Sequence, residues 1–235
     1  MKNKKYLEFL FLIILGALTS LSLPPYNYLL INFLTLGLFF IYIFQKKRST
    51  KKNNSFLYGW LFGFGYFLTN LYWITISLTF DKNFSFLIPF ALIFIPLFLS
   101  IFYGLATYCF FKIGMKKPVS NLFLFSLLLG VAEFLRGIIL TGFPWNLIAF
   151  SFSENIEILQ ILSFTGTYGF NILCISFFAS PAILIIRESR KEIMVCIFLL
   201  ISPIILYSLG SSNIKSFQSS NSVKSNYTIR IIGSK

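Results

Sequence analysis

Apolar runs of 17 or more residues recur along this chain of 235 residues, and they constrain its fold more than any other feature. A helix of about 20 apolar residues is long enough to cross the hydrocarbon core of a bilayer. Hydrophobic residues make up 57% of the chain and charged residues only 11%, whereas soluble domains carry about a quarter charged residues. The sequence therefore predicts an all-α membrane protein.

The apolar runs predict a bundle of seven transmembrane helices, which together form a membrane domain of residues 1–209. Gly59 and Gly63 are spaced like the small residues that let a second helix approach closely. The sixth run is over-long and is interrupted by Gly166, Gly169 and Pro181. The expected spans are 7–23, 29–44, 56–78, 86–111, 122–140, 158–186 and 193–209.

Basic residues are concentrated in alternate connections between these spans. The N-terminus and the loops at 45–54, 112–121 and 187–192 hold 14 Lys and Arg residues, whereas the other loops hold only Lys82. The positive-inside rule then places the N-terminus in the cytoplasm and the C-terminus on the periplasmic side. We interpret the net charge of +13 as this orientation signal and expect no nucleic-acid partner.

Residue types that usually carry catalysis or bind metals are scarce. The chain has no His, which removes the commonest general base and metal ligand. Its three Cys residues, Cys109, Cys174 and Cys196, all lie within apolar runs. This placement argues against a disulfide framework or a Cys-rich metal site, and we expect neither a metal nor a cofactor.

Glu133 and Arg136 place an acid and a base three residues apart inside the fifth apolar run. A charged side chain in hydrocarbon costs at least about 3 kcal/mol unless it is paired or hydrated, so such residues suggest a functional site. Their spacing puts both on one helix face, close enough to neutralise each other. Two interpretations stay open: a structural ion pair that fixes helix packing, or a polar floor beneath a site for a charged headgroup.

Other polar and aromatic residues fall in the same half of the expected bundle. Their placement predicts one shared cavity, although hydrogen-bonded contacts between helices would give the same pattern. Tyr168 and Asn171 are expected nearer the middle of the membrane, and the other candidates toward its outer side. The candidate cavity residues are Asn70, Trp73, Glu133, Arg136, Phe143, Pro144, Trp145, Tyr168 and Asn171.

The C-terminal tail differs in composition from the apolar runs. Residues 210–226 are rich in Ser, Asn and Lys and predict a flexible linker. Residues 227–235 begin with a short β-prone run of partial alternation. Because a lone strand is not stable without a sheet, we expect this run to be the first strand of an absent domain.

The run Glu133-Phe-Leu-Arg-Gly-Ile-Ile-Leu-Thr-Gly-Phe-Pro-Trp-Asn146 resembles the membrane part of bacterial apolipoprotein N-acyltransferases. Its Glu-Phe-Leu-Arg-Gly and Thr-Gly-Phe-Pro-Trp segments are the most specific part of the resemblance. The order and spacing of the seven spans also agree with the family. Weaker matches lie at residues 23–26, at 59–73 and at 166–171.

The resemblance implies a multi-pass protein of the bacterial inner membrane that acts in lipoprotein maturation. Enzymes of this family transfer an acyl chain from a phospholipid to the N-terminal diacylglyceryl-cysteine of a lipoprotein. The implied partners are therefore a phospholipid acyl donor and a diacylglyceryl lipoprotein acceptor. In the family, a periplasmic nitrilase-like domain follows the seventh span, and its Glu-Lys-Cys triad carries the acyl group as a thioester.

By the resemblance, Lys235 is expected to lie only a few residues into what would be the nitrilase-like domain. We expect the membrane domain alone, without catalytic residues and inactive by itself, with a separately encoded nitrilase-like domain as one way of completing the enzyme. Cys109 and Cys196 are expected near the cytoplasmic ends of their spans, and Cys174 in mid-membrane, so none replaces the nucleophile. The alternative is a non-enzymatic lipid-binding or transporter-like membrane protein, although no convincing internal repeat supports it.

The predicted orientation has a direct test in cells. A reporter that is active only in the cytoplasm, fused after Lys235, is expected to be silent because the positive-inside rule places that end outside. An active reporter would contradict the orientation.

Overall fold

The computed structural model describes residues 2–49, 54–139 and 142–219, and every regular element in these ranges is helical. This confirms the helical prediction for the described residues. The α-helices are α1 Lys2–Thr19, α2 Ile31–Arg48, α3 Ser55–Asn70, α4 Ile74–Ser77, α5 Ile88–Ile113, α6 Pro118–Ile138, α7 Ile156–Leu159, α8 Leu162–Ala179, α9 Ala182–Ile186 and α10 Arg190–Ser219. Three 3-10 turns accompany them, η1 Ser20–Ser22, η2 Lys82–Leu87 and η3 Ile148–Phe152.

Five helical segments in the described ranges are long and apolar enough to cross a membrane. They are Lys5–Ser22, Lys82–Ile113, Pro118–Ile138, Leu162–Ala179 and Arg190–Ser219. The helix α3 has only 16 residues, and α2 carries three basic residues in its last turn. The helices therefore support a multi-pass membrane protein, whereas seven crossings stay a prediction.

Two of the expected spans are broken in the structure. The third ends at Asn70, and the separate short helix α4 follows it. The sixth is divided among α7, α8 and α9, and α8 contains a kink at Gly166, where φ is +65°. Glycine adopts positive φ at little cost because it has no Cβ, so the interruption that the sequence predicted at Gly166 is a change of chain direction.

The last described helix extends beyond the expected seventh span. Residues 210–219 belong to α10, so this part of the expected linker is helical. Gly210 packs against the backbone of Glu157, and a methyl group at Gly210 would overlap that carbonyl oxygen. Contact with α7 therefore holds α10 at this point. The remaining linker residues and the expected strand at 227–235 lie outside the described residues.

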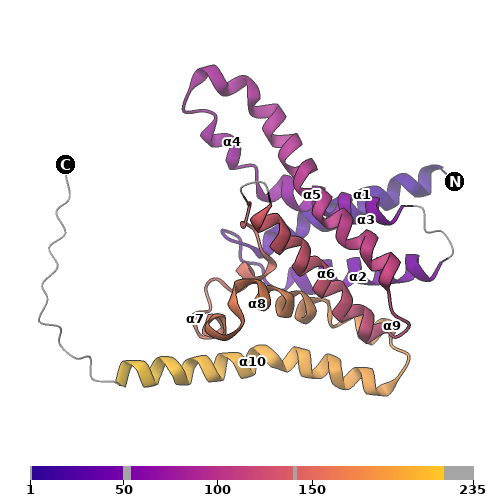
Figure 1. Ribbon diagram of the computed structural model, residues 1–235, viewed down its shortest axis with the longest axis vertical. Helices are drawn as coiled ribbons and strands as arrows, with labels where there is room; N and C mark the ends of the chain where they lie inside the picture. Colours follow the sequence, from indigo (N-terminus) through magenta and orange to yellow (C-terminus); the bar gives the residue numbers. More distant parts are fainter. Residues whose placement is uncertain (1, 50–53, 140–141, 220–235) are drawn as a thin grey trace, which may run out of the picture.

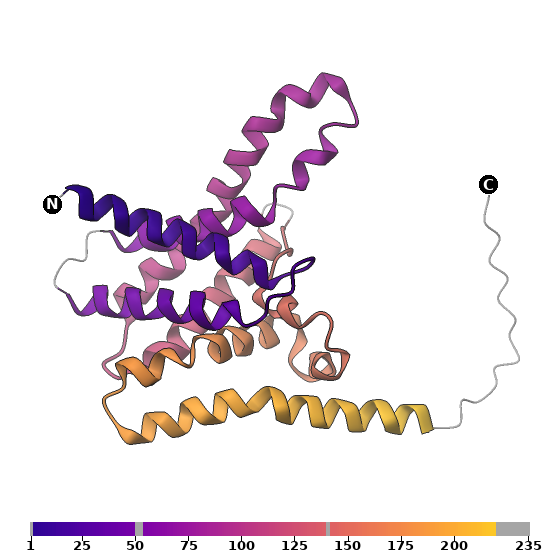
Figure 2. The ribbon, with the colours of Figure 1, turned by 180° about the vertical axis from the view of Figure 1, so that it is seen from behind.

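The helices form a bundle with two distinct ends, which Figures 1 and 2 show from opposite sides. The helix α10 lies along one side of the bundle (Figure 1). The first half of α5, together with η2 and α4, projects from the opposite side as a hairpin (Figure 2). The start of α1, the end of α2 and the connection from α9 to α10 lie at the same end, here called the basic pole.

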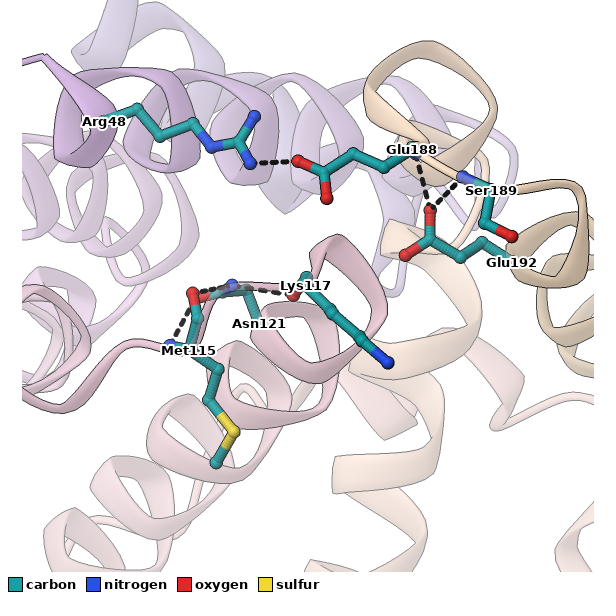
Figure 3. Close-up of polar contacts among 7 residues, drawn as sticks. All are labelled: Arg48, Met115, Lys117, Asn121, Glu188, Ser189 and Glu192. Atoms are coloured by element: carbon teal, nitrogen blue, oxygen red, sulfur yellow. Dashed lines mark hydrogen bonds and ion pairs between the residues drawn. The ribbon is translucent and has the colours of Figure 1, made fainter.

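Polar contacts fasten the connections at the basic pole (Figure 3). Arg48 of α2 pairs with Glu188 in the connection between α9 and α10. The carboxylate of Glu192 accepts hydrogen bonds from the backbone N–H groups of Glu188 and Ser189, at 2.7 and 3.3 Å. Near α1, Lys46 pairs with Glu8 at 2.8 Å. Each of the described carboxylates at this end, Glu8, Glu188 and Glu192, therefore has an ion-pair or hydrogen-bond partner.

Glycines allow α3 to pack closely between α1 and α5. A methyl group on Gly65 would overlap the carbonyl oxygen of Ile13 in α1. On another face of α3, Gly59 lies against the backbone of Tyr103 in α5, and Gly63 lies against the same helix. The structure thus confirms that Gly59 and Gly63 admit a neighbouring helix.

Replacing Gly65 with alanine should destabilise the bundle, because the added methyl group would push α1 away from α3. We expect the free energy of unfolding to fall by about 1–3 kcal/mol, the usual cost of overpacking. Gly37→Ala is the matched control, because a Cβ there would meet nothing within 4 Å. Thermal unfolding in detergent measures both variants, and equal midpoints would contradict the close packing of α1 on α3.

Candidate functional site

A cavity of about 400 Å³ opens at the end of the bundle opposite the basic pole. It lies between the turn after η1, the end of α3 and the loop that precedes η3. Its walls are mainly apolar and aromatic, with polar side chains from each of these segments. The lining residues are Ser20, Leu23, Pro24, Pro25, Tyr26, Thr69, Asn70, Tyr72, Trp73, Trp145, Asn146, Phe150 and Ser153.

Three of the residues predicted from the sequence line this cavity, namely Asn70, Trp73 and Trp145. The rings of Trp73 and Trp145 lie with their centroids 5.7 Å apart and their planes inclined by 57°. These two residues are separated by more than 70 positions in the chain. The structure therefore brings together the end of α3 and the loop after α6.

A second cavity of about 420 Å³ lies on the other side of Trp145. Pro144 and Tyr168, which were also predicted, line this second cavity together with Leu147 and Thr167. Trp145 and Phe150 line both cavities. Five of the nine candidate residues thus line two neighbouring spaces with an aromatic wall in common, where the sequence predicted a single cavity. The other four, Glu133, Arg136, Phe143 and Asn171, line neither space.

Glu133 is fully buried in the middle of the bundle. Its carboxylate accepts a hydrogen bond from the Tyr103 hydroxyl at 2.5 Å and another from the Asn171 side-chain amide. Asn171 in turn accepts a hydrogen bond from the backbone N–H of Ala149 at 2.9 Å. Glu133 is therefore connected to α5, α8 and η3 through neutral hydrogen-bond donors.

Arg136 is also buried, with only 1% of its surface exposed. Its Nη1 donates to the carbonyl oxygen of Phe143 at 3.0 Å, and the backbone N–H of Phe143 donates to the Arg136 carbonyl at 2.8 Å. The guanidinium lies over the Phe67 ring, 5.0 Å from its centroid. These contacts hold the loop at Phe143 against the end of α6.

The expected direct pairing of Glu133 with Arg136 is not observed. No nitrogen–oxygen distance between their side chains is within 4.0 Å, the limit for an ion pair. Spacing along a helix places two residues on one face, but it does not set the direction of their side chains. Tyr103 and Asn171 occupy the carboxylate of Glu133, and the guanidinium of Arg136 is directed toward the loop.

Four buried side-chain nitrogen atoms of the loop and helix ends described above have no hydrogen-bond partner among the described residues. They are Nε and Nη2 of Arg136 and the side-chain amide nitrogens of Asn70 and Asn146. Buried donors are almost always paired in folded proteins. All four are donors. Asn70 and Asn146 line the first cavity, whereas Arg136 lines neither of the two cavities. The site therefore offers hydrogen bonds to a ligand with acceptor oxygens, such as a phosphate, a carboxylate or an ester.

Three residues that the sequence reasoning did not select take part in this region. Tyr103 donates to Glu133, and Tyr66 donates to the backbone carbonyl of Asn146 at 2.8 Å. Both tyrosines are buried among apolar residues. A tyrosine buried in an apolar run usually needs a partner for its hydroxyl, so this signal was present in the sequence. Asn146, with φ +60°, ends the motif that carried the resemblance.

The three cysteines lie away from the first cavity. Cys174 is buried in α8 and lines a small apolar pocket with Phe170 and Pro203. Cys196 is buried in α10, where its thiol donates to the Ser180 carbonyl at 3.4 Å. Cys109 is half-buried in α5. None of the three is among the residues that line the two cavities beside Trp145.

Comparison with known proteins gives consistent matches to one family. The family model of the apolipoprotein N-acyltransferase N-terminal domain matches residues 15–180. An apolipoprotein N-acyltransferase of Rhodopseudomonas palustris is 32% identical over 174 residues, which cover 72% of this chain and 32% of the relative. The apolipoprotein N-acyltransferase of Rickettsia prowazekii is 33% identical over 198 residues, which cover 83% of this chain and 39% of the relative. The chain thus spans about a third of the length of these relatives.

Removing the Tyr103 hydroxyl should destabilise the bundle, because the buried carboxylate of Glu133 would lose one of its two donors. For Tyr103→Phe we expect a fall of about 1–3 kcal/mol in the free energy of unfolding. Tyr168→Phe is the control, since Tyr168 packs edge-to-face on Phe134 and donates no side-chain hydrogen bond within the described ranges. Chemical denaturation in detergent measures the free energy of unfolding of both variants. If Tyr103→Phe leaves that free energy unchanged, the hydrogen bond from Tyr103 to Glu133 does not stabilise the bundle.

Proposed function

Since this chain belongs to the apolipoprotein N-acyltransferase family, we propose that it binds the lipid substrates of that reaction at the cavity beside Asn70 and Trp145. In this proposal residues 1–209 form a domain of seven spans in the bacterial inner membrane. The complete enzyme transfers an acyl chain from a phospholipid to the N-terminal diacylglyceryl-cysteine of a lipoprotein. This chain supplies the surface on which the lipids are held.

The unpartnered donors of Asn70 and Asn146, which line the cavity, are the observation that carries the proposal. An unpaired buried donor costs about 1–3 kcal/mol, and an acceptor supplied by a ligand removes that cost. A phospholipid presents phosphate and ester oxygens at the boundary between its headgroup and its acyl chains. A cavity with apolar walls and several donors at one side suits that boundary.

The side chains offer distinct roles toward such a lipid. The planar guanidinium of Arg136 suits phosphate oxygens, and the amides of Asn70 and Asn146 suit the neutral ester carbonyls. Trp73 and Trp145 have the amphipathic rings that are enriched at membrane–water interfaces. They would position the lipid with its headgroup at the mouth of the cavity.

The second cavity suits an acyl chain. Its lining is mainly apolar, and it has Trp145 and Phe150 in common with the first cavity. A lipid whose polar part lies beside Asn70 could extend one chain past this aromatic wall toward Pro144 and Tyr168. Glu133 and Asn171 would act indirectly, because they hold the loop and η3 that form the wall.

We assign no catalytic residue to this chain. A nucleophilic thiol would have to reach a lipid in the first cavity, and no Cys residue lines it. We propose that the acyl thioester forms on a nitrilase-like domain, which residues 210–226 would link to the membrane domain and residues 227–235 would begin. The chain alone is then expected to bind lipid without transferring acyl groups.

Intrinsic fluorescence gives a sharp test of lipid binding, because the chain has only three Trp residues and two of them line the cavity. Trp60→Phe leaves Trp73 and Trp145 as the reporters. A phospholipid with brominated acyl chains, titrated into the purified chain in detergent, should quench this fluorescence saturably. In the same background Asn70→Leu should weaken binding about tenfold, which corresponds to the loss of one hydrogen bond to a ligand.

The stability of the variant separates binding from folding. Asn70→Leu removes a donor that has no partner in the protein, so we expect its unfolding midpoint to stay close to that of the parent. Asn83→Leu, on the projecting hairpin, is the control and should bind the lipid normally. Quenching that never saturates, or that is the same in Asn70→Leu, would refute the proposed site.

A further inference from the structure

A separate pocket of about 220 Å³ lies at the basic pole, between the start of α3 and the end of α5. It is lined by Ser55, Tyr108, Phe111 and Lys112. The whole length of α3 separates Ser55 from Asn70 in the first cavity. Whatever binds at the basic pole is therefore independent of the lipid-substrate site proposed above.

Ser55 presents an unused hydroxyl to this pocket. The residue is only 8% exposed, and its side chain makes no hydrogen bond with the described residues. The hydroxyl oxygen itself keeps some accessible surface, because it is not among the enclosed side-chain atoms that lack a partner. Since Ser55 lines the pocket, a ligand in the pocket is the partner that the geometry leaves available.

The start of α3 adds backbone donors at the same place. The residue before the helix, Asn54, makes no capping hydrogen bond through its side chain. The first N–H groups of a helix have no partner within the helix, and together with the helix dipole they favour an anion. The helix α3 has 16 residues, which is long enough for this effect.

Lys112 supplies a positive charge that no described carboxylate neutralises. Its ammonium lies over the Tyr108 ring, 5.5 Å from the centroid, and no carboxylate oxygen of the described residues is within 4.0 Å. The acids of this pole are engaged elsewhere: Glu8 pairs with Lys46, and Glu188 pairs with Arg48 (Figure 3). An anion from outside the chain would complete the site.

We propose that this pocket binds a phosphate group. The hydroxyl of Ser55 and the first N–H groups of α3 donate hydrogen bonds to the phosphate oxygens, and the ammonium of Lys112 pairs with their charge. The rings of Tyr108 and Phe111 form the apolar side of the pocket. The phosphate comes either from the headgroup of a lipid in the leaflet at this pole or from a soluble phosphate.

The test uses the full chain purified in detergent and two lipids with the same acyl chains. Native mass spectrometry compares the retention of dioleoyl phosphatidic acid with that of dioleoylglycerol, which lacks the phosphate. A parallel thermal-unfolding series adds inorganic phosphate as the soluble probe. The variants are Ser55→Ala and Lys112→Gln, and Lys191→Gln is the control because it removes a charge at the same pole outside the pocket.

We expect phosphatidic acid to be retained over dioleoylglycerol, and each pocket variant to weaken that retention about tenfold, as for the loss of one charge-assisted hydrogen bond. Lys191→Gln should bind like the parent. A variant-sensitive shift with inorganic phosphate alone would support a soluble source. If neither probe distinguishes the pocket variants from Lys191→Gln, the phosphate site is wrong. Lys112 is exposed, so Lys112→Gln is expected to fold even if Ser55→Ala does not.

Discussion

The carboxylate of Glu133 must find hydrogen-bond donors inside the bundle, because hydrocarbon offers none and an unpaired charge there is costly. The structure supplies those donors from two other helices, with Tyr103 on α5 and Asn171 on α8. One buried group therefore holds α5, α6 and α8 in a common register. Asn171 extends this connection to η3 by accepting from the N–H of Ala149, so the loop beside the cavities depends on the same interaction.

This arrangement leaves Arg136 free of Glu133. Arg136 uses one nitrogen to hold the loop at Phe143 and keeps Nε and Nη2 unpaired. A bidentate ion pair with Glu133 would have used two of the five N–H groups of Arg136 within the protein. The two members of the sequence motif thus differ in their contacts: Glu133 connects three helices, and Arg136 holds the loop at Phe143.

The sequence predicted the helical class, which the structure confirms for the described residues, and it singled out Glu133 and Arg136, whose role in function stays a prediction. These predictions rest on composition and on a strong local motif, which a single chain displays. The direct Glu133–Arg136 ion pair was one of two interpretations that the sequence left open. It is not observed because neighbouring helices decide where a buried side chain points, and spacing along one helix does not. The role of Tyr103 and the separation of the candidate residues into two cavities depend on contacts between distant segments. The helical continuation through residues 210–219 was missed because their polar composition is typical of a linker, whereas packing of Gly210 on α7 supports a helix.

The most direct test of this account is an experimental structure of the chain in phospholipid nanodiscs, at a resolution that shows headgroups. The account predicts that lipid oxygens lie about 3 Å from Nη2 of Arg136 or from the amide of Asn146, which is hydrogen-bonding distance, with Glu133 still bonded to Tyr103 and Asn171. A guanidinium of Arg136 paired directly with Glu133, beside a cavity without lipid, would contradict it.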